Sequence, residues 1–152
     1  MGGRQVRRLG THLTFTADVK GLVFDGKVGN VWYVAVVDVE TRAFRLIKEF
    51  SRHYNHAQCS PVDPDLFTIS QDHWKDPYTG KQNGYDLRIW LMTTDGERFE
   101  PADPTAYHGP TKQGNEVSHE WWAQDGTLCW IRYQQGCYEM DQNSGKITHV
   151  WK

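Results

Sequence analysis

Three histidines each begin a similar short segment, and histidine can bind a metal or move a proton near neutral pH. The segments run from His12 to Asp18, from His56 to Asp65, and from Ser118 to Gly126, where His119 follows the first residue. In each segment, strand-forming residues lead from the histidine to a turn that carries aspartate, and an apolar strand follows. We therefore predict that the three histidines occupy equivalent positions in a repeated unit.

The rest of the chain predicts strands and no long helix. Short β-branched and aromatic runs alternate with turns of Gly, Pro, Asn and Asp, which is typical of all-β proteins. Pairs such as Asp95-Gly96 and Asp125-Gly126 suit tight hairpin turns. We expect three units of four strands, near Leu13–Thr16, Leu22–Phe24, Val31–Val39, Ala43–Lys48, Ala57–Cys59, Leu66–Ser70, Leu87–Thr93, Arg98–Glu100, Val117–Trp122, Leu128–Tyr133, Cys137–Asp141 and Ile147–Trp151.

Four-stranded repeats of about 40–45 residues are typical of β-propeller blades. The sequence thus predicts a single partial β-propeller domain over residues 1–152, with about three antiparallel blades near residues 11–50, 55–100 and 116–152. Long loops at Asp72–Tyr85 and Pro101–Asn115 make the spacing unequal. Because propellers typically have about four to eight blades, we interpret the chain as a piece of a longer protein, as a self-associating unit, or as a different β fold.

Composition narrows the classes of partner. The formal net charge of −2 over 152 residues favours neither a nucleic acid nor a membrane surface. No apolar run reaches about 18 residues, so we expect no transmembrane helix, and the basic N-terminal residues lack the apolar stretch of a signal peptide. Three cysteines, without metal-ligand spacing, are expected to be reduced and buried, which favours a cytoplasmic protein.

Three motifs resemble the oligogalacturonate lyase family, over about His56–Trp151. They are NHAQCSPVDPD (Asn55–Asp65), DLRIWLMTTDG (Asp86–Gly96) and SHEWWAQDG (Ser118–Gly126). The resemblance implies a propeller enzyme of pectin degradation that cleaves galacturonate oligosaccharides by β-elimination with a divalent metal, usually manganese. It also implies that His119 is a metal ligand.

The same chemistry suggests further site residues. A base must remove the proton at C5 of the uronate, and a cation must neutralise the neighbouring carboxylate. We assign His56 as the candidate base and Arg88 as the candidate carboxylate contact. His73 and Arg132 are candidate substrate-binding residues. His73 shares the long loops with His108 and Lys112, and we interpret these loops either as a lid over the site or as solvated surface loops.

Structural alternatives stand beside these roles. His119 can pack beside Trp121, and Arg88 can pair with Asp86 or stack on Trp90, since alternation puts residues 86, 88 and 90 on one face. By the same alternation, Glu120 faces away from His119 and is a poor metal partner for it.

The sequence departs from the family pattern in two places. The family's later Gln-x-x-His-x-His ligand segment is absent, and Ser70–Trp74 stands where the family carries His-Glu-Gly-Pro. These departures favour a non-catalytic propeller segment, or an inactive fragment that serves as a binding scaffold. Exposed blade faces also predict self-association.

Overall fold

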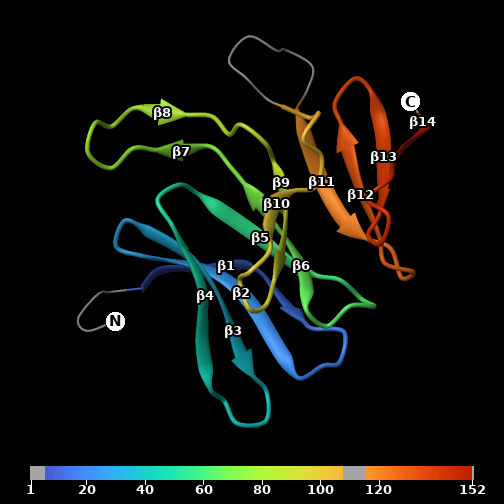
Figure 1. Ribbon diagram of the computed structural model, residues 1–152. Coiled ribbons are helices and arrows are strands. Elements are labelled where there is room, and N and C mark those ends of the chain that lie inside the picture. Colours follow the sequence, from blue (N-terminus) through green and yellow to red (C-terminus); the bar gives the residue numbers. More distant parts are fainter. Residues whose placement is uncertain (1–5, 108–115, 152) are drawn as a thin grey trace.

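The computed structural model describes residues 6–107 and 116–151, and these form antiparallel β-sheets (Figure 1). Neither range contains a helix, and so none that is long and apolar enough to cross a membrane. The all-β class and the three four-stranded antiparallel sheets that the sequence predicts are confirmed.

Each of the three sheets is a meander, because its strands lie side by side in the order in which they occur along the chain. The first has the order β1-β2-β3-β4, with β1 (Val6–Phe15), β2 (Gly21–Val28), β3 (Val31–Asp38) and β4 (Phe44–Phe50). The second has the order β10-β9-β6-β5, with β5 (Tyr54–Cys59), β6 (Leu66–Gln71), β9 (Ile89–Thr93) and β10 (Phe99–Pro101). The third has the order β11-β12-β13-β14, with β11 (Val117–Trp122), β12 (Thr127–Arg132), β13 (Gly136–Asp141) and β14 (Ile147–Trp151).

Two features differ from the expected strands. Strand β1 begins at Val6, well before Leu13. The long loop after β6 contains a small hairpin of β7 (Trp74–Lys75) and β8 (Gln82–Asn83). The hairpin escaped prediction because strands of two residues carry no readable alternation, and the Asp, Pro and Gly between them indicate only a turn.

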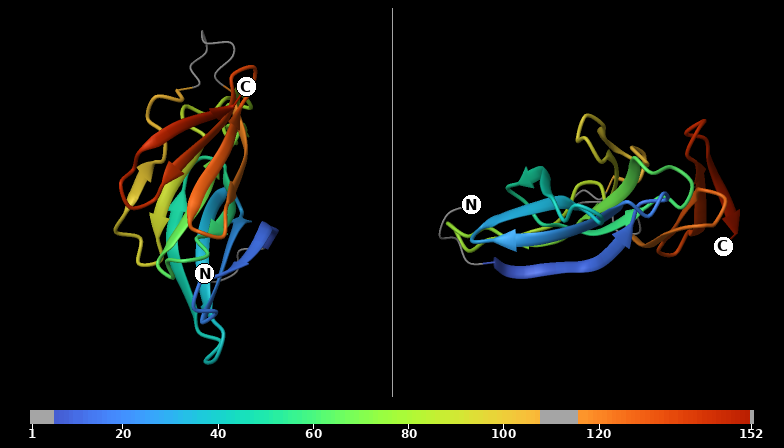
Figure 2. Two further views of the ribbon diagram at one scale, coloured as in Figure 1. Left: turned by 90° about the vertical axis from the view of Figure 1, so that its right-hand side faces the viewer. Right: turned by 90° about the horizontal axis from the view of Figure 1, so that it is seen from below.

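The second sheet lies between the other two, as the views of Figure 2 show. Its central strand β6 is buried along its whole length. Because side chains alternate along a strand, Phe67 and Ile69 join one core cluster with Val23 and Val34 of the first sheet. The other face contributes to a second cluster, where Leu66 packs with residues of the third sheet that include Leu128 and the fully buried Trp130.

Aspartates close many of the turns, as the sequence predicts. The carboxylate of Asp125 accepts the backbone N–H of Thr127 at 2.9 Å, and that of Asp141 accepts the N–H of Ser144 at 2.7 Å. Gly126 takes the positive φ of 86° that the Asp-Gly turn requires. These backbone hydrogen bonds lower the pKa of both aspartates.

The first strands of the sheets are joined by hydrogen bonds from side chains. Thr14 Oγ1 of β1 accepts the backbone N–H of Cys59 on β5 at 3.1 Å. Gln58 of β5 donates to the carbonyl of Glu120 at 3.1 Å, and Trp122 of β11 donates to the carbonyl of Gln58 at 2.9 Å. The histidine-bearing strands are thereby fixed against one another.

Candidate functional site

Each of the three predicted histidines lies at a break in the pairing of the first strand of its sheet. In β5, pairing jumps from Asn55 to Gln58 while the partner strand advances by one residue less, which defines a β-bulge at His56. Pairing of β11 jumps in the same way at His119, between Ser118 and Trp121. Pairing of β1 is irregular between Leu9 and Leu13, around His12. His56 and His119 thus occupy equivalent positions, both with positive φ, whereas the irregularity around His12 adds two residues to β1 instead of one and His12 is not among the residues with positive φ.

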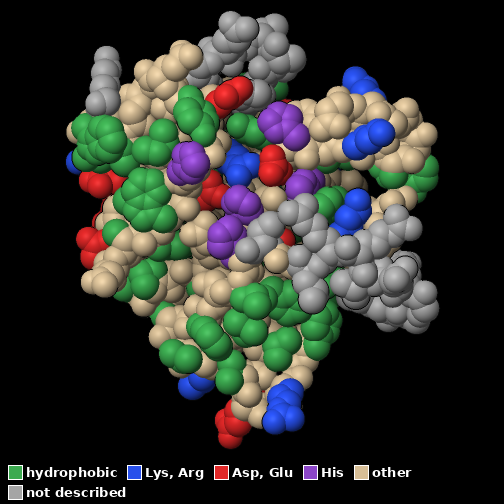
Figure 3. Space-filling view, turned by 180° about the vertical axis from the view of Figure 1, so that it is seen from behind, with side chains coloured by type: hydrophobic (Ala, Val, Ile, Leu, Met, Phe, Trp, Pro, Cys, Tyr) green, Lys and Arg blue, Asp and Glu red, His purple; other side chains and the backbone are tan. Residues whose placement is uncertain are grey.

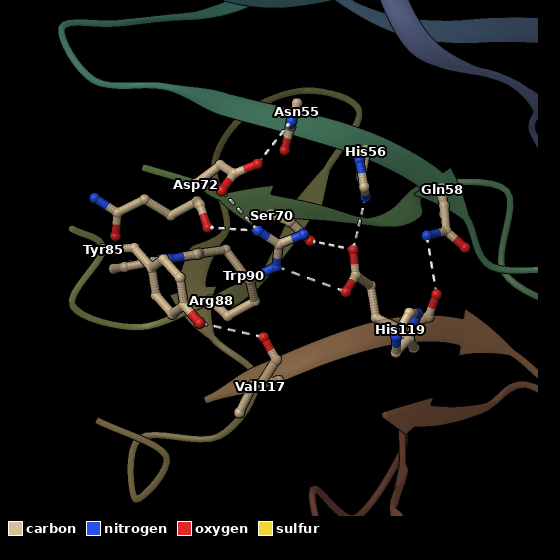
Figure 4. Close-up of polar contacts among 12 residues, drawn as sticks. Asn55, His56, Gln58, Ser70, Asp72, Tyr85, Arg88, Trp90, Val117 and His119 are labelled. Atoms are coloured by element: carbon tan, nitrogen blue, oxygen red, sulfur yellow. Dashed lines mark hydrogen bonds and ion pairs between the residues drawn. The ribbon is translucent and has the colours of Figure 1, made fainter. Parts of the chain in front are cut away.

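A polar cluster around Glu120 connects the second and third sheets, and Figure 4 labels its partners His56, Ser70 and Arg88. The Glu120 side chain is 1% exposed, and its Oε1 lies 3.2 Å from His56 Nδ1. Ser70 donates its hydroxyl to the same oxygen at 2.7 Å. Arg88 Nε lies 3.8 Å from Oε2. One carboxylate therefore connects β11 with β5, β6 and the residue that precedes β9.

Arg88 is held by acidic groups and carbonyls of its own sheet. Its side chain is 8% exposed, and its Nη1 lies 3.2 Å from Asp72 Oδ1 and donates to the carbonyl of Gln71 at 3.4 Å. The guanidinium also lies over the ring of Tyr85, 5.7 Å from its centroid. Arg88 thus carries one positive charge between two carboxylates, those of Asp72 and Glu120.

The pairing of Arg88 with Asp86, considered from the sequence, is wrong. Asp86 instead pairs with Arg52, with 2.9 Å between Nη1 and Oδ2. Arg88 does not stack on Trp90 either, because Trp90 stacks on Phe99 with ring centroids 4.6 Å apart. The reason is that β9 begins at Ile89, so strand alternation does not extend to residues 86 and 88.

The buried cluster favours ionised carboxylates. Burial by itself would raise the pKa of Glu120, but the hydrogen bond with His56, the charge of Arg88 and the hydrogen bond from Ser70 outweigh it, so the pKa is lowered. Burial also opposes ionisation of Asp72, whose pKa is nevertheless lowered by its hydrogen bond to the backbone of His73 and by Arg88. The site therefore holds two carboxylates on either side of one guanidinium, and one of these carboxylates, that of Glu120, contacts His56.

His119 lies apart from this cluster, although it precedes Glu120. Its ring is exposed and its Nε2 lies 3.1 Å from the hydroxyl of Tyr133. The packing beside Trp121, considered from the sequence, is replaced by this contact with Tyr133, whose ring centroid lies 6.0 Å away. His12 and His56 form a separate edge-to-face pair, with ring centroids 4.7 Å apart.

An open hollow of about 290 Å³ adjoins the cluster. Its lining residues are Asp72, His73, Tyr85, Arg88, Glu116, Val117, Ser118 and Tyr133. In the view from behind in Figure 3, histidine side chains gather with acidic and basic side chains in the middle of the face turned to the viewer. The structure thus brings the two candidates His73 and Arg88 to one hollow.

The remaining candidates lie elsewhere. Arg132 is buried, pairs with Asp103, donates to Thr105 Oγ1 at 2.9 Å and stacks 4.4 Å from the centroid of Tyr138. It does not line the hollow. His108 and Lys112 fall outside the described residues.

Glu120, Asp72, Ser70 and Tyr133 form part of the site but were not proposed as site residues from the sequence. Ser70 and Asp72 do lie in the stretch that replaces the family's His-Glu-Gly-Pro segment, which was the available signal. No periodic pattern marks Glu120, because the bulge at His119 interrupts the alternation that would place it.

The described residues do not form a metal centre by themselves. No group of three or more His, Cys, Asp or Glu residues in the described ranges is placed to hold a metal ion. The donors near His119 are therefore too few for the three protein ligands of a typical catalytic zinc site.

The fold of this chain is similar to that of solved structures. No family model and no curated protein matches the sequence. An oligogalacturonate lyase in complex with manganese matches with a TM-score of 0.72 and 18% identity, over 91% of this chain and 40% of that chain. An oligogalacturonate lyase from Vibrio parahaemolyticus matches with a TM-score of 0.75 and 18% identity, over 94% of this chain and 41% of that chain.

These matches confirm, at the level of the fold, the resemblance to oligogalacturonate lyases noted in the sequence. The chain spans about two-fifths of the length of these two structures. An identity of 18% extends the likeness to the fold and no further.

Proposed function

We propose that this chain is an oligogalacturonate lyase-like protein, whose sheets are blades of a β-propeller and whose hollow at His73 and Arg88 binds acidic galacturonate oligosaccharides. The observation that carries the proposal is the contact of His56 with the buried carboxylate of Glu120, which in turn lies next to Arg88, a lining residue of that hollow. The fold shared with oligogalacturonate lyases supports it. The activity of the whole enzyme is part of the proposal.

The proposed reaction is β-elimination. His56 takes the proton from C5 of the uronate, the electron pair of that C–H bond forms the C4–C5 double bond, and the bond from C4 to the glycosidic oxygen breaks. That oxygen leaves with a proton from solvent. A neutral histidine suits the role, because the base must be unprotonated at working pH. Arg88 and His73 face the sugar carboxylate and offset its negative charge.

Manganese enters only as a proposal for His119. A divalent cation would supply the neutralisation of the sugar carboxylate that the elimination needs. The described residues do not complete such a site, so no step is derived through the metal. We assign to His119 a single ligand position and expect the isolated chain to bind Mn²⁺ weakly.

A non-catalytic binding scaffold is the second candidate function. It is favoured by the engagement of Arg88 with both Asp72 and Glu120, which leaves little positive charge for a substrate carboxylate. Under this proposal the chain binds acidic sugars but performs no elimination.

Titration of the isotopically labelled chain with trigalacturonate, followed by NMR, tests the binding. We expect shifts at residues lining the hollow, weaker shifts with a neutral trisaccharide, and loss of binding in His73→Gln, whose side chain is 55% exposed. His149→Gln is the matched control, because its ring stacks on Tyr138 in the third sheet. Equal binding of neutral and acidic sugars would contradict both candidate functions.

Ultraviolet absorbance of the unsaturated product then separates the two functions. An increase with Mn²⁺ present that is lost in His56→Gln supports the lyase. Binding of trigalacturonate without any increase supports the scaffold.

A further inference from the structure

We propose that Glu120 is the positioning residue of His56, which it holds in the tautomer with the proton on Nδ1 and the lone pair on Nε2. The inference deepens the proposed function and rests on it only for the claim that this lone pair takes a proton from the sugar. The tautomer itself is a property of the chain without substrate.

The donors around Glu120 determine the tautomer. An ionised carboxylate has no proton to donate, so a ring nitrogen in hydrogen-bond contact with it must carry the hydrogen. Oε1 of Glu120 lies 3.2 Å from His56 Nδ1 and accepts the hydroxyl of Ser70 at 2.7 Å. In the neutral ring Nε2 is then the unprotonated nitrogen, which is the atom that a general base uses.

Burial makes this arrangement rigid. A carboxylate that is 1% exposed is costly unless charges and donors compensate it. Arg88 supplies the opposite charge from the other side of the carboxylate, with Nε 3.8 Å from Oε2. Arg88 Nε and Glu120 Oε2 are both buried and have no hydrogen-bond partner among the described residues, so at this separation they interact through their charges.

The backbone and a neighbouring ring restrict His56 further. Its φ of 56° at the bulge sets the direction in which the side chain leaves β5. The ring of His12 packs edge-to-face on it, with centroids 4.7 Å apart. With the His56 side chain only 30% exposed, the contact with Glu120 is kept rather than exchanged freely with water. Glu120 thus does for His56 what a buried carboxylate does for the histidine of a catalytic triad.

The net charge of the cluster also favours the role of His56 as a base. Asp72, Glu120 and Arg88 together carry one net negative charge when both carboxylates are ionised. A proton gained by His56 during the reaction would bring the group to neutrality. The imidazolium therefore forms next to a carboxylate that stabilises it.

Long-range ¹H–¹⁵N NMR of the histidine rings tests the proposal on the full chain without ligand. Two other histidines are internal references: Nε2 of His149 lies 2.9 Å from the carbonyl of Gln135, and Nδ1 of His53 lies 3.0 Å from the carbonyl of His73. Each of these nitrogens must carry the hydrogen. We expect His56 to show the pattern of His53, with a protonated Nδ1, at a pH where the ring is neutral.

Substitution tests the cause. In Glu120→Gln the side chain keeps its shape but becomes a weaker acceptor and gains an N–H₂ donor, so we expect the Nδ1–H form of His56 to lose its dominance while the references stay unchanged. Ser70→Ala removes the other donor to Oε1 and should leave the tautomer of His56 as it is. If Glu120→Gln does not fold, the parent spectrum still decides.

Three outcomes are informative. An Nε2–H tautomer for His56 in the parent, or an unchanged tautomer in folded Glu120→Gln, overturns the proposal. The expected tautomer together with no binding of trigalacturonate leaves Glu120 as the positioning residue and overturns the function. Where elimination is detected, Glu120→Gln should lower kcat by about 10²-fold with KM nearly unchanged.

Discussion

His56 and His119 adopt the same left-handed backbone conformation, with φ of 56° and 54°, each at the extra residue of a bulge in the first strand of its sheet. For a residue other than glycine this conformation costs of order 1–3 kcal/mol. Two copies of one strained arrangement, both on histidine, indicate that the repeated unit presents this side chain in a particular direction. Bulges are known to re-aim side chains next to active sites.

The strain predicts an unusual order of stabilities at residue 119. Glycine adopts positive φ without the steric penalty of a Cβ, so His119→Gly should be about 1 kcal/mol more stable than His119→Ala. Urea denaturation of both variants measures the difference. The matched pair Ser118→Gly and Ser118→Ala should show the opposite order, since Ser118 is not among the residues with positive φ. Equal stability of the two residue-119 variants would contradict strain at His119.

The repeat of strands and histidines could be predicted, but the bulges could not. Runs of apolar and β-branched residues between Asp-Gly turns identify strands locally, and the histidine positions follow from the repeat. A bulge adds one residue to one strand, and its pairing depends on the partner strand. The inward direction of Glu120, and its contact with His56, became visible only in three dimensions.

The partners of the two buried arginines, Arg88 and Arg132, could not be predicted from the sequence either. Alternation suggested a near neighbour for Arg88, yet its partners are Asp72 and Glu120. Arg132 pairs with Asp103, from the connection before the third sheet. Such pairs form where loops and strands from distant parts of the sequence meet, and strand periodicity contains no information on them. Fold class was therefore predictable from the sequence, whereas the ion pairs of the site were not.

The ion pair of Arg132 predicts a structural role for this residue. Arg132→Met leaves the carboxylate of Asp103 buried and unpaired, and we expect the free energy of unfolding to fall by about 3–5 kcal/mol. Arg98→Met is the control, because its partner Glu100 is exposed and the pair should contribute less than about 1 kcal/mol. Chemical denaturation measures both. A loss as small as that of the control, accompanied by weaker binding of trigalacturonate, would instead favour the substrate-binding role predicted from the sequence.

The turn aspartates predict a loss of stability in acid. Backbone and side-chain hydrogen bonds from Ser144 hold the pKa of Asp141 below its ordinary value of 3.8, and the unfolded chain lacks these bonds. The contribution to stability is therefore present above pH 3.8 and is lost as the pH falls through the folded-state pKa. Asp141→Asn should make the pH dependence of the unfolding free energy shallower below pH 3.8. An unchanged slope would contradict the shifted pKa.

Exposed apolar side chains on β1 and β14, the edge strands of the first and third sheets, predict self-association. Leu13 and Phe15 of β1 are 69% and 54% exposed, and Trp151 of β14 is 60% exposed. Apolar surface of this kind is unfavourable in water, and a stable interface of standard size buries about 800 Å² per partner. Sedimentation velocity should show concentration-dependent oligomers, reduced by the double substitution Leu13→Lys and Phe15→Lys. Tyr78→Lys, at the exposed tip of the β7–β8 hairpin, is the control and should leave association unchanged. A compact monomer of the parent chain at millimolar concentration would show that these strands are tolerated in water without a covering partner.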